Sequence, residues 1–295
     1  MQGNFSDAQI LLEQTYSTIA SNGQHNISLC CDFLAARLSL FQEGVTFVKN
    51  PEVKRKELLS LHNMMWLNIF DSTYAYYYAL IRMPEKIPAL FKDHMLSTVS
   101  FLSPCRPMME MIENQVYLAQ GAYAKVVGRS AELLAACEAM HYALVALHIR
   151  IQTAAAYARL GKPETAHTWL QKALSDAGPD GLVMPFAENY SLLKPLLARE
   201  TRSAFAARIT ALGEAAQARG AERLRPAAFR ALTAREFEIV ELMAQRLSNR
   251  EIAQKCYLSE GSVKQYVNQI YSKLHIEGDT RTKRAQLAAL LHEKT

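Results

Sequence analysis

The chain has 295 residues, of which half are apolar and only 22 are glycine or proline. This composition excludes disordered and collagen-like proteins, and the length allows two domains with ordinary cores. No apolar run reaches the roughly 18 residues of a membrane span, and the N-terminus lacks the pattern of a secretory signal. Five cysteines without C-x-x-C spacing argue against a disulfide framework and a zinc site. We therefore expect a cytoplasmic protein with no membrane contact, metal or cofactor.

The positive charge is unevenly distributed along the chain. Residues 1–195 contain 16 Lys and Arg against 17 Asp and Glu, whereas residues 196–295 contain 17 against 11. An excess of positive charge favours a polyanion as partner. A nucleic-acid interface is therefore expected in the last third of the chain, although many solvated helical faces are also basic.

A motif recurs about every forty residues in the first two thirds of the chain. In "YLAQGAYAKV" and "YARLGKPETA", an aromatic residue precedes a glycine by four positions. Less complete copies lie closer to the N-terminus, and the five anchors are Gly3, Gly44, Arg82, Gly121 and Gly161. The steps between them are 41, 38, 39 and 40 residues. Such an even spacing is typical of repeat proteins.

The segments between the anchors have the spacing of helices. Residues 131–161 carry apolar residues at three-to-four spacing without a proline, and Gly161 stands in the stop position. The next segment starts with Pro163, which suits a first helical turn, and ends at Gly178. No segment alternates with period two for long enough to predict a strand. Each repeat is therefore expected to be an antiparallel helix pair that turns at its anchor, and the pairs to stack into a solenoid.

The first anchor lies only two residues after Met1, so the first repeat would lack its leading helix. Two explanations remain open. We favour the first, in which the chain is the C-terminal part of an ancestral longer protein. In the second, the first helix caps the solenoid in an atypical way.

Aromatic residues are concentrated in "WLNIFDSTYAYYYALI", residues 66–81. Trp66, Tyr74, Tyr77 and Tyr78 are candidates for a ligand-binding surface on the concave side of the solenoid. The alternative, which we favour, is that these side chains fill the solenoid core and that each phenol oxygen reaches a hydrogen-bond partner.

The segment after Lys194 is rich in alanine and arginine. It predicts a helix from about Pro195 to Gly213 or Gly220, because glycine commonly ends a helix. A loop through Pro226 would follow, so that residues 220–231 are the expected domain boundary.

Three helix starts follow at short intervals. "TARE" at 233–236 and "SNRE" at 248–251 are capping boxes, in which a hydroxyl accepts from the backbone three residues on and the acid reaches back. Each is worth about 1 kcal/mol to a short helix. The third start, "SEGS" at 259–262, has a serine cap but no closing acid. A helix N-terminus without that acid can receive a phosphate, although Glu260 returns a negative charge to the same turn.

The helix after Ser259 has two different faces. Its apolar stripe has the spacing of a core-facing side and consists of Val263, Val267, Ile270 and Leu274. The opposite side carries Lys264, Gln265, Asn268 and Ser272. Lysine can donate to guanine or phosphate, and the two amides can pair with an adenine edge. The same composition also suits a solvated surface, so this helix alone leaves both interpretations open.

The helix that precedes Ser259 favours the interpretation of this segment as a DNA-binding element. Residues 249–256 form a short helix, and only Tyr257 and Leu258 separate it from the Ser259 cap. Two short helices joined by such a turn, with the small Ala253 allowing close approach, form a helix-turn-helix. The span "LTAREFEIVELMAQRLSNREIAQKCYLSEGSVKQYVNQIYSKLHI" resembles the LuxR/GerE-type DNA-binding domain of bacterial regulators, over roughly residues 230–292. That resemblance implies four helices, of which the third enters the major groove and the fourth, about residues 282–291, contacts a second copy.

The resemblance also implies roles for single residues. It places Lys264, Gln265 and Asn268 at base edges or nearby phosphates. The residues that it places at or beside the DNA backbone are Ser262, Tyr266, Lys273 and Asn249. The sequence departs from the family's pattern at Arg246, where a small glycine is common, at Cys256, where a core leucine is usual, and at Tyr266, where histidine is common. Tyrosine keeps a donor at that position but changes its reach.

The repeat region resembles, more loosely, the TPR-like region of MalT-like regulators, best over residues 157–197. Those regulators carry an ATPase module, but this chain contains no G-x-x-x-x-G-K-[ST], so no nucleotide site is expected. The expected fold is all-α. It comprises a TPR-like helical-hairpin solenoid over residues 1–200, a helix and linker over 201–229, and a four-helix LuxR-type helix-turn-helix domain over 230–295.

The expected function is that of a bacterial transcription regulator that binds double-stranded DNA. A homodimer, at least on DNA, is expected from the small face formed by Ala285, Ala288 and Ala289. The repeat region would sense a small molecule or a protein partner. The alternative is a scaffold whose C-terminal domain docks on protein instead of DNA. An enzyme is not expected, because His141 and His148 lie on repeat helices without a metal-ligand cluster or a nucleophile pair.

Overall fold

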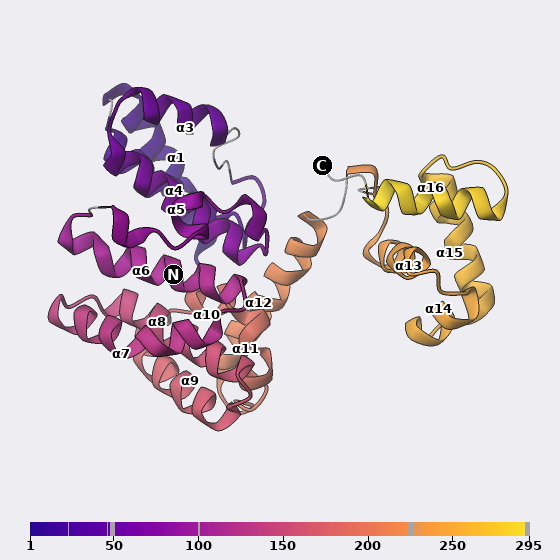
Figure 1. The fold of residues 1–295 in the computed structure, drawn as a ribbon. Coiled ribbons are helices and arrows are strands. Elements are labelled where there is room, and N and C mark those ends of the chain that lie inside the picture. The colour runs from indigo at the N-terminus through magenta and orange to yellow at the C-terminus, as the bar shows by residue number, and fades with distance from the viewer. Residues whose placement is uncertain are drawn as a thin grey trace. The chain divides into compact units, whose positions relative to one another are not determined.

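The structure of the chain is a computed structural model. It describes residues 1–22, 24–45, 47, 51–99, 101–223, 227–229 and 231–292. Every regular element within these ranges is helical, which confirms the prediction of an all-α protein (Figure 1). The chain divides into two compact units, Met1–Gln217 and Ala218–Thr295. Among the described residues no helix has the length and apolar character needed to cross a membrane.

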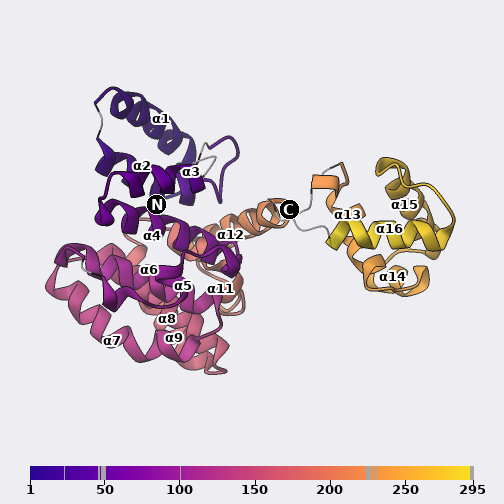
Figure 2. The ribbon, with the colours of Figure 1, turned by 45° about the horizontal axis from the view of Figure 1, so that its top comes forward.

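The first unit contains a succession of antiparallel helices. Its described α-helices are α1 (Phe5–Asn22), α2 (His25–Leu38), α3 (Pro51–Ser60), α4 (Met64–Leu80), α5 (Ala89–Lys92), α6 (Arg106–Ala119), α7 (Tyr123–Ala139), α8 (Ala143–Arg159), α9 (Pro163–Ala177), α10 (Met184–Glu188) and α11 (Tyr190–Leu197). Helix α12 (Ala204–Arg223) begins in this unit and extends past its limit at Gln217. Helices α6 to α9 pack in chain order, each against the next (Figure 2). That these pairs form a TPR-like solenoid stays a prediction.

The repeat anchors lie at turns. All five have a positive φ, from 58° at Arg82 to 95° at Gly3. Gly121 lies between α6 and α7, and Gly161 between α8 and α9. Glycine adopts this left-handed backbone without steric penalty, whereas an arginine is strained there. A further turn at His141, with φ of 56°, divides the helical stretch 131–161 into α7 and α8, and no glycine or proline marks it.

The two ends of the first unit are in contact with one another. The backbone N–H of Met184 donates to the carbonyl of Met1 over 3.0 Å, and the side chain of Gln2 donates to the carbonyl of Asp180 over 2.9 Å. Phe41 shares an apolar cluster with Met184. In an open solenoid each repeat touches only its neighbours. The start of the first unit therefore packs directly against a segment about 180 residues later, beyond the neighbour-only contacts of an open solenoid.

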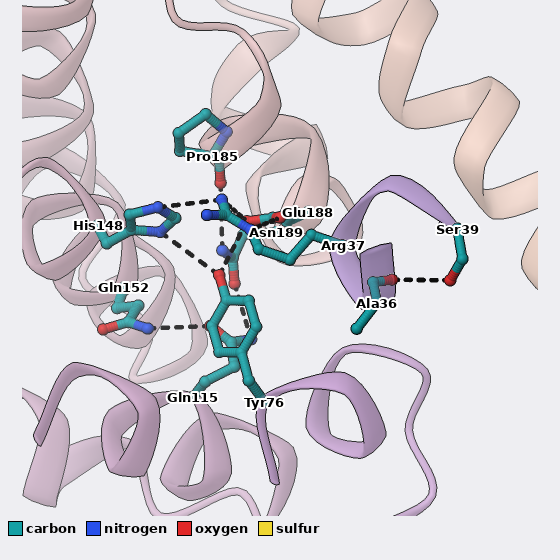
Figure 3. Close-up of polar contacts among 10 residues, drawn as sticks. All are labelled: Ala36, Arg37, Ser39, Tyr76, Gln115, His148, Gln152, Pro185, Glu188 and Asn189. Atoms are coloured by element: carbon teal, nitrogen blue, oxygen red, sulfur yellow. Dashed lines mark hydrogen bonds and ion pairs between the residues drawn. The ribbon is translucent and has the colours of Figure 1, made fainter. Parts of the chain in front are cut away.

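A buried ion pair accompanies this contact (Figure 3). Arg37 of α2 donates from Nε and Nη2 to the two carboxylate oxygens of Glu188 of α10, over 2.6 and 2.9 Å. The hydroxyl of Tyr76 in α4 donates to the same carboxylate over 2.8 Å. His148 of α8 lies 3.2 Å from Arg37 Nη2, and burial together with the Arg37 charge lowers the pKa of its imidazole. A neutral imidazole can accept from the guanidinium, so one polar cluster joins four helices.

The aromatic residues of α4 lie in and beside an apolar cluster. Tyr74 is 3% exposed and packs with Phe70, as the core interpretation predicts, but its hydroxyl has no hydrogen-bond partner among the described residues. Trp66 donates from Nε1 to Asn26 over 2.5 Å. Tyr77 and Tyr78 are half-buried. A ligand-binding role for Trp66, Tyr74, Tyr77 and Tyr78 stays a prediction.

The helix predicted from Pro195 to Gly213 or Gly220 is wrong in both its limits. Helix α11 ends at Leu197, and α12 then continues through both glycines to Arg223. Gly213 has a packing role instead of a terminating one, because a Cβ at this position would lie 2.2 Å from the Tyr190 ring. The contact between α11 and α12 thus requires glycine, which sequence spacing alone does not reveal.

The second unit is a small helical domain. Its helices are α13 (Ala234–Ala244), α14 (Asn249–Cys256), α15 (Glu260–Lys273) and α16 (Thr280–His292). A 3₁₀ turn, Ala227–Phe229, precedes them and places Phe229 in the core. The most deeply buried side chains of that core are Phe229, Ile239, Val240, Ile252, Val263, Ile270 and Leu287. That this unit and the first correspond to separately folding domains with the expected limits stays a prediction.

Candidate nucleic-acid interface

Helices α13 and α14 both begin with the capping boxes that the sequence predicts. The N–H of Thr233 donates to Glu236 over 2.7 Å, and the N–H of Glu236 donates back to the Thr233 hydroxyl over 3.3 Å. Ser248 and Glu251 repeat the arrangement with the same distances. These reciprocal bonds satisfy backbone donors that have no partner within their own helix. The first turns of α13 and α14 are thereby fixed.

Helix α15 begins differently. The hydroxyl of Ser259 accepts from the N–H of Ser262 over 3.1 Å, but no acid returns to the cap. The two serine hydroxyls lie 2.9 Å apart, so Ser262 is engaged within the cap. Glu260 is exposed in the first turn. A phosphate at this N-terminus would meet free N–H groups and one neighbouring carboxylate.

Arg235 of α13 fixes the turn between α14 and α15, a role that the sequence alone does not indicate. Tyr257 has a left-handed backbone with φ of 55°, and its side chain is 96% exposed. Arg235 of α13 donates from its guanidinium to the carbonyl of Cys256, the last residue of α14. Its other branch bonds Glu238 over 2.6 Å. Arg235 therefore fixes the end of α14 against α13.

The apolar stripe of α15 faces the core of the second unit. Val263 and Ile270 are fully buried, Val267 is buried, and Leu274 is half-buried. All four pack in one cluster with Ile252 of α14. The predicted core face is confirmed, and it fixes which side of α15 remains exposed.

The opposite face of α15 is exposed, and its side chains have no partner among the described residues. The side chains of Lys264, Gln265, Asn268 and Ser272 are all exposed. None of them bonds to another residue of the described part of the chain. At about 100° per residue, the four positions gather on one side of the helix. This polar face can therefore bond to a partner without first breaking a bond of its own.

We compared the chain with known proteins. Residues 230–285 match the family described as bacterial regulatory proteins, luxR family. The second unit carries a luxR-family domain. "Transcriptional regulatory protein LnrK" of Bacillus subtilis (strain 168) is 44% identical over 50 residues, which are 17% of this chain and 23% of that protein. The similarity thus spans about a quarter of that relative's length. No solved structure matches the chain.

Several flanking residues of the luxR-family domain are bound within the domain itself. Lys273 lies 2.8 Å from Glu236, and Asn249 accepts from Arg284 of α16 over 3.3 Å. Tyr266 is half-buried against the core. Burial would raise the pKa of Glu236, but the bonds from Lys273 and Thr233 outweigh burial and lower it. Contacts of Lys273, Asn249, Tyr266 and Ser262 with the DNA backbone stay predictions.

Two departures from the luxR-family pattern have a structural reading. Arg246 has φ of 63°, a conformation that suits the glycine common at this position. Cys256 is 4% exposed and fills the core where leucine is usual. The first departure strains the backbone, whereas the second leaves a smaller side chain in the core.

Helix α16 of the luxR-family domain presents small residues to solvent. Leu287 is buried in the core, whereas Ala285 and Ala289 are exposed and Ala288 is half-buried. Arg284 donates to the carbonyl of Leu247 over 3.1 Å and thus ties α16 to the start of α14. Dimerisation through the exposed alanines stays a prediction.

The cysteines and acidic residues form no further site in the described part of the chain. All five cysteines are free thiols. No three His, Cys, Asp or Glu side chains are grouped as metal ligands would be among the residues that the structure describes.

Proposed function

We propose that this protein is a bacterial transcription regulator that binds specific DNA sequences through α15. The observation that carries the proposal is the exposed face of Lys264, Gln265, Asn268 and Ser272, which has no side-chain partner within the described ranges, on a helix whose other side is buried. The luxR-family match over residues 230–285 and the similarity to a protein named as a transcriptional regulator support it.

The geometry suits major-groove recognition. An α-helix fits the major groove, where lysine bonds guanine or phosphate and the amides of Gln and Asn bond adenine. The buried stripe of α15 and the bonds of Arg235 and Lys273 fix the position of this helix. All the side chains of its polar face are therefore presented together to the DNA. The excess of Lys and Arg over residues 196–295 adds a favourable, sequence-independent attraction to phosphates.

The first unit would sense an effector, and the second would form a dimer on DNA. The first unit lies outside the luxR-family match, and its helices line a polar cavity. The exposed alanines of α16 allow close approach of a second copy. A dimer would place two α15 helices on the two half-sites of one operator.

DNA binding is tested by selecting bound sites from random duplexes, followed by fluorescence anisotropy of the full chain with the selected duplex. We expect an affinity that falls steeply as salt rises, because phosphate contacts release counterions. A chain that binds no duplex, or whose affinity does not fall with salt, contradicts the proposal. In that case the scaffold alternative, with the second unit docking on protein, takes its place.

Dimerisation is tested by sedimentation of the full chain with and without the selected duplex. Ala289→Glu is expected to separate the dimer, because it places a charge in the exposed small face of α16. The matched control is Ala207→Glu, at an exposed position of α12 in the first unit. A chain that sediments as a monomer under both conditions contradicts this part of the proposal.

A further inference from the structure

A cavity of about 320 Å³ lies within the first unit. Its walls come from the end of α4, from α6 and α7, from the end of α8, and from α10 and α11. The polar side chains that line it are Arg82, Gln115, Tyr123, Arg159, Asn189 and Ser191, and Glu188 joins them. Since one water occupies about 30 Å³ of liquid, the cavity has room for roughly ten waters, the size of a small metabolite.

The lining of this cavity is positively charged. Arg82 and Arg159 are exposed, and neither forms an ion pair with a carboxylate of the described residues. Glu188 is the one carboxylate in the lining, but both of its oxygens are bonded by Arg37, and Tyr76 adds a third bond (Figure 3). These bonds offset the negative charge of Glu188, so the guanidinium groups of Arg82 and Arg159 dominate the charge of the lining.

Two amides of the cavity lining, Gln115 and Asn189, belong to a chain of hydrogen-bonded amides (Figure 3). Gln152 donates to the Gln115 carbonyl over 3.0 Å, and Gln115 donates to the Asn189 carbonyl over 3.0 Å. Asn189 in turn donates to the carbonyl of Pro185 over 3.3 Å. The side-chain oxygens of Gln115 and Asn189 thus each accept one hydrogen bond already, and each of the two amides keeps a second N–H. These second N–H groups are donors for a ligand, which suits an anion.

Arg82 stands at the one repeat anchor of the five that is not glycine. Its φ of 58° lies in the left-handed region, where an arginine is strained. Its guanidinium donates to the Ser191 hydroxyl over 2.8 Å, which fixes it at the cavity, and its other N–H groups have no partner among the residues that the structure describes. Strained backbone that persists in a structure is often found where a side chain has a function.

We propose that this cavity binds a small organic anion, with its carboxylate or phosphate group held by Arg82 and Arg159 and by the free N–H groups of Gln115 and Asn189. The assignment gives chemical content to the proposed effector-sensing role of the first unit and rests on it. Planar guanidinium groups bond carboxylate and phosphate oxygens in pairs, which makes arginine suited to both groups. Glu188 joins this cavity to the buried ion pair between α2 and α10, so an occupied cavity stabilises the first unit.

The test is calorimetric titration of the full chain with succinate, sn-glycerol 3-phosphate and, as an uncharged isostere, succinamide. We expect at least one of the two anions to saturate the protein and succinamide not to bind. Which of the two binds more tightly distinguishes a carboxylate ligand from a phosphate ligand. The bound anion is also expected to raise the melting temperature of the first unit, followed by tryptophan fluorescence, since both tryptophans, Trp66 and Trp169, lie there.

The decisive variant is Arg82→Gly, which restores the residue found at the other anchors. It is expected to weaken anion binding about 10-fold or more, as the loss of a charge-assisted bond predicts. Its melting temperature without ligand should stay the same or rise, because glycine relieves the left-handed backbone. Arg159→Gln is expected to weaken binding similarly, whereas Arg202→Gly, at an exposed turn outside the cavity, should leave binding unchanged.

The cavity assignment is overturned if neither anion saturates the protein, if succinamide binds as well as succinate, or if Arg82→Gly and Arg159→Gln bind the anion as the parent chain does. DNA binding without any added anion is measured separately. A chain that binds the anion but no duplex refutes the proposed regulator and leaves the cavity assignment standing. A chain that binds duplex but no anion refutes only the cavity assignment.

Discussion

Lys273, at the end of α15, forms an ion pair with Glu236, in the first turn of α13, and its ammonium lies 2.8 Å from each carboxylate oxygen. The same carboxylate accepts from the N–H of Thr233 and closes the capping box of α13. One buried carboxylate thus serves both the start of one helix and the position of another. The orientation of the proposed DNA-reading helix therefore depends on a residue that does not face DNA.

Removing Lys273 should loosen the second unit. Lys273→Met leaves Glu236, which is 2% exposed, without its counter-charge, and we expect a loss of about 1–3 kcal/mol in the free energy of unfolding. The measurement is hydrogen exchange of peptides from 234–276 in the full chain. Lys255→Met, at an exposed position of α14, is the control. Equal exchange in both variants would show that the ion pair contributes nothing.

The second unit should be sensitive to acid. The pKa of Glu236 is lowered in the folded chain, since bonds from Lys273 and Thr233 outweigh the opposing effect of burial. A carboxyl group with a lowered folded pKa stabilises the fold above its unfolded pKa of about 4.3, and this contribution is lost as pH falls through and below that value. Exchange of peptides from 234–276 should therefore accelerate below about pH 4.3. Glu236→Gln should be less stable at neutral pH but show a smaller change on acidification; an unchanged pH profile would exclude this group as the cause.

Replacing Arg246 by glycine should stabilise the second unit. Because its φ of 63° suits glycine, Arg246→Gly is expected to stabilise the second unit by about 0.5–1 kcal/mol. Arg246→Ala removes the same side chain but keeps the strained backbone, so it should bring no such gain. Hydrogen exchange of the peptides around 242–252 distinguishes the two variants. If alanine stabilises as much as glycine, the arginine side chain and not the backbone is unfavourable.

Breaking the Arg37–Glu188 pair should destabilise the first unit. Either Arg37→Met or Glu188→Leu leaves an unpaired charge in a buried site, and we expect each to reduce stability by about 3–5 kcal/mol. The double variant should be less destabilised than the sum, since no charge remains uncompensated. Urea unfolding followed by the fluorescence of Trp66 and Trp169 reports on this unit alone. Additive losses would mean that the two side chains act independently.

The polar face of α15 should determine DNA specificity. Lys264→Ala and Asn268→Ala are each expected to weaken binding to the selected duplex by about 1–3 kcal/mol if they contact base edges. Binding to unrelated duplexes should change less. Lys56→Ala, at an exposed position of α3 in the first unit, is the control for loss of one positive charge. Equal losses on all duplexes would indicate phosphate contacts instead of base recognition.

Local features of this fold are legible in the sequence because they depend on residues close in the chain. The capping boxes at Thr233 and Ser248 span three residues each, and the buried stripe of α15 follows the helical period. The repeat anchors all have a left-handed backbone. Because glycine adopts this conformation without strain, its regular recurrence in the sequence indicates the turns. The turn at His141 escaped detection, because a left-handed histidine has no distinctive neighbour in the sequence.

Contacts between distant residues could not be predicted in the same way. Arg37 and Glu188 are 151 positions apart, and no periodic pattern relates them. The pairing of Lys273 with Glu236 was also missed, because each residue already had a local interpretation. Residues of six helices line the cavity, and these residues are far apart in the sequence. The one indication of the cavity in the sequence is Arg82, which stands where the other repeat anchors have glycine.

Gly213 lies in the middle of α12, with no space for a β-carbon beside the ring of Tyr190. Glycine is the least favourable ordinary residue in a helix interior, so this helix has a weaker intrinsic tendency to form than an alanine in its place would give. Packing against Tyr190 thus requires glycine at position 213, whereas helix formation alone would favour another residue there. A helix that relies on its neighbour for stability in this way is formed together with the body against which it packs, and an isolated peptide of the same sequence would be mostly unfolded.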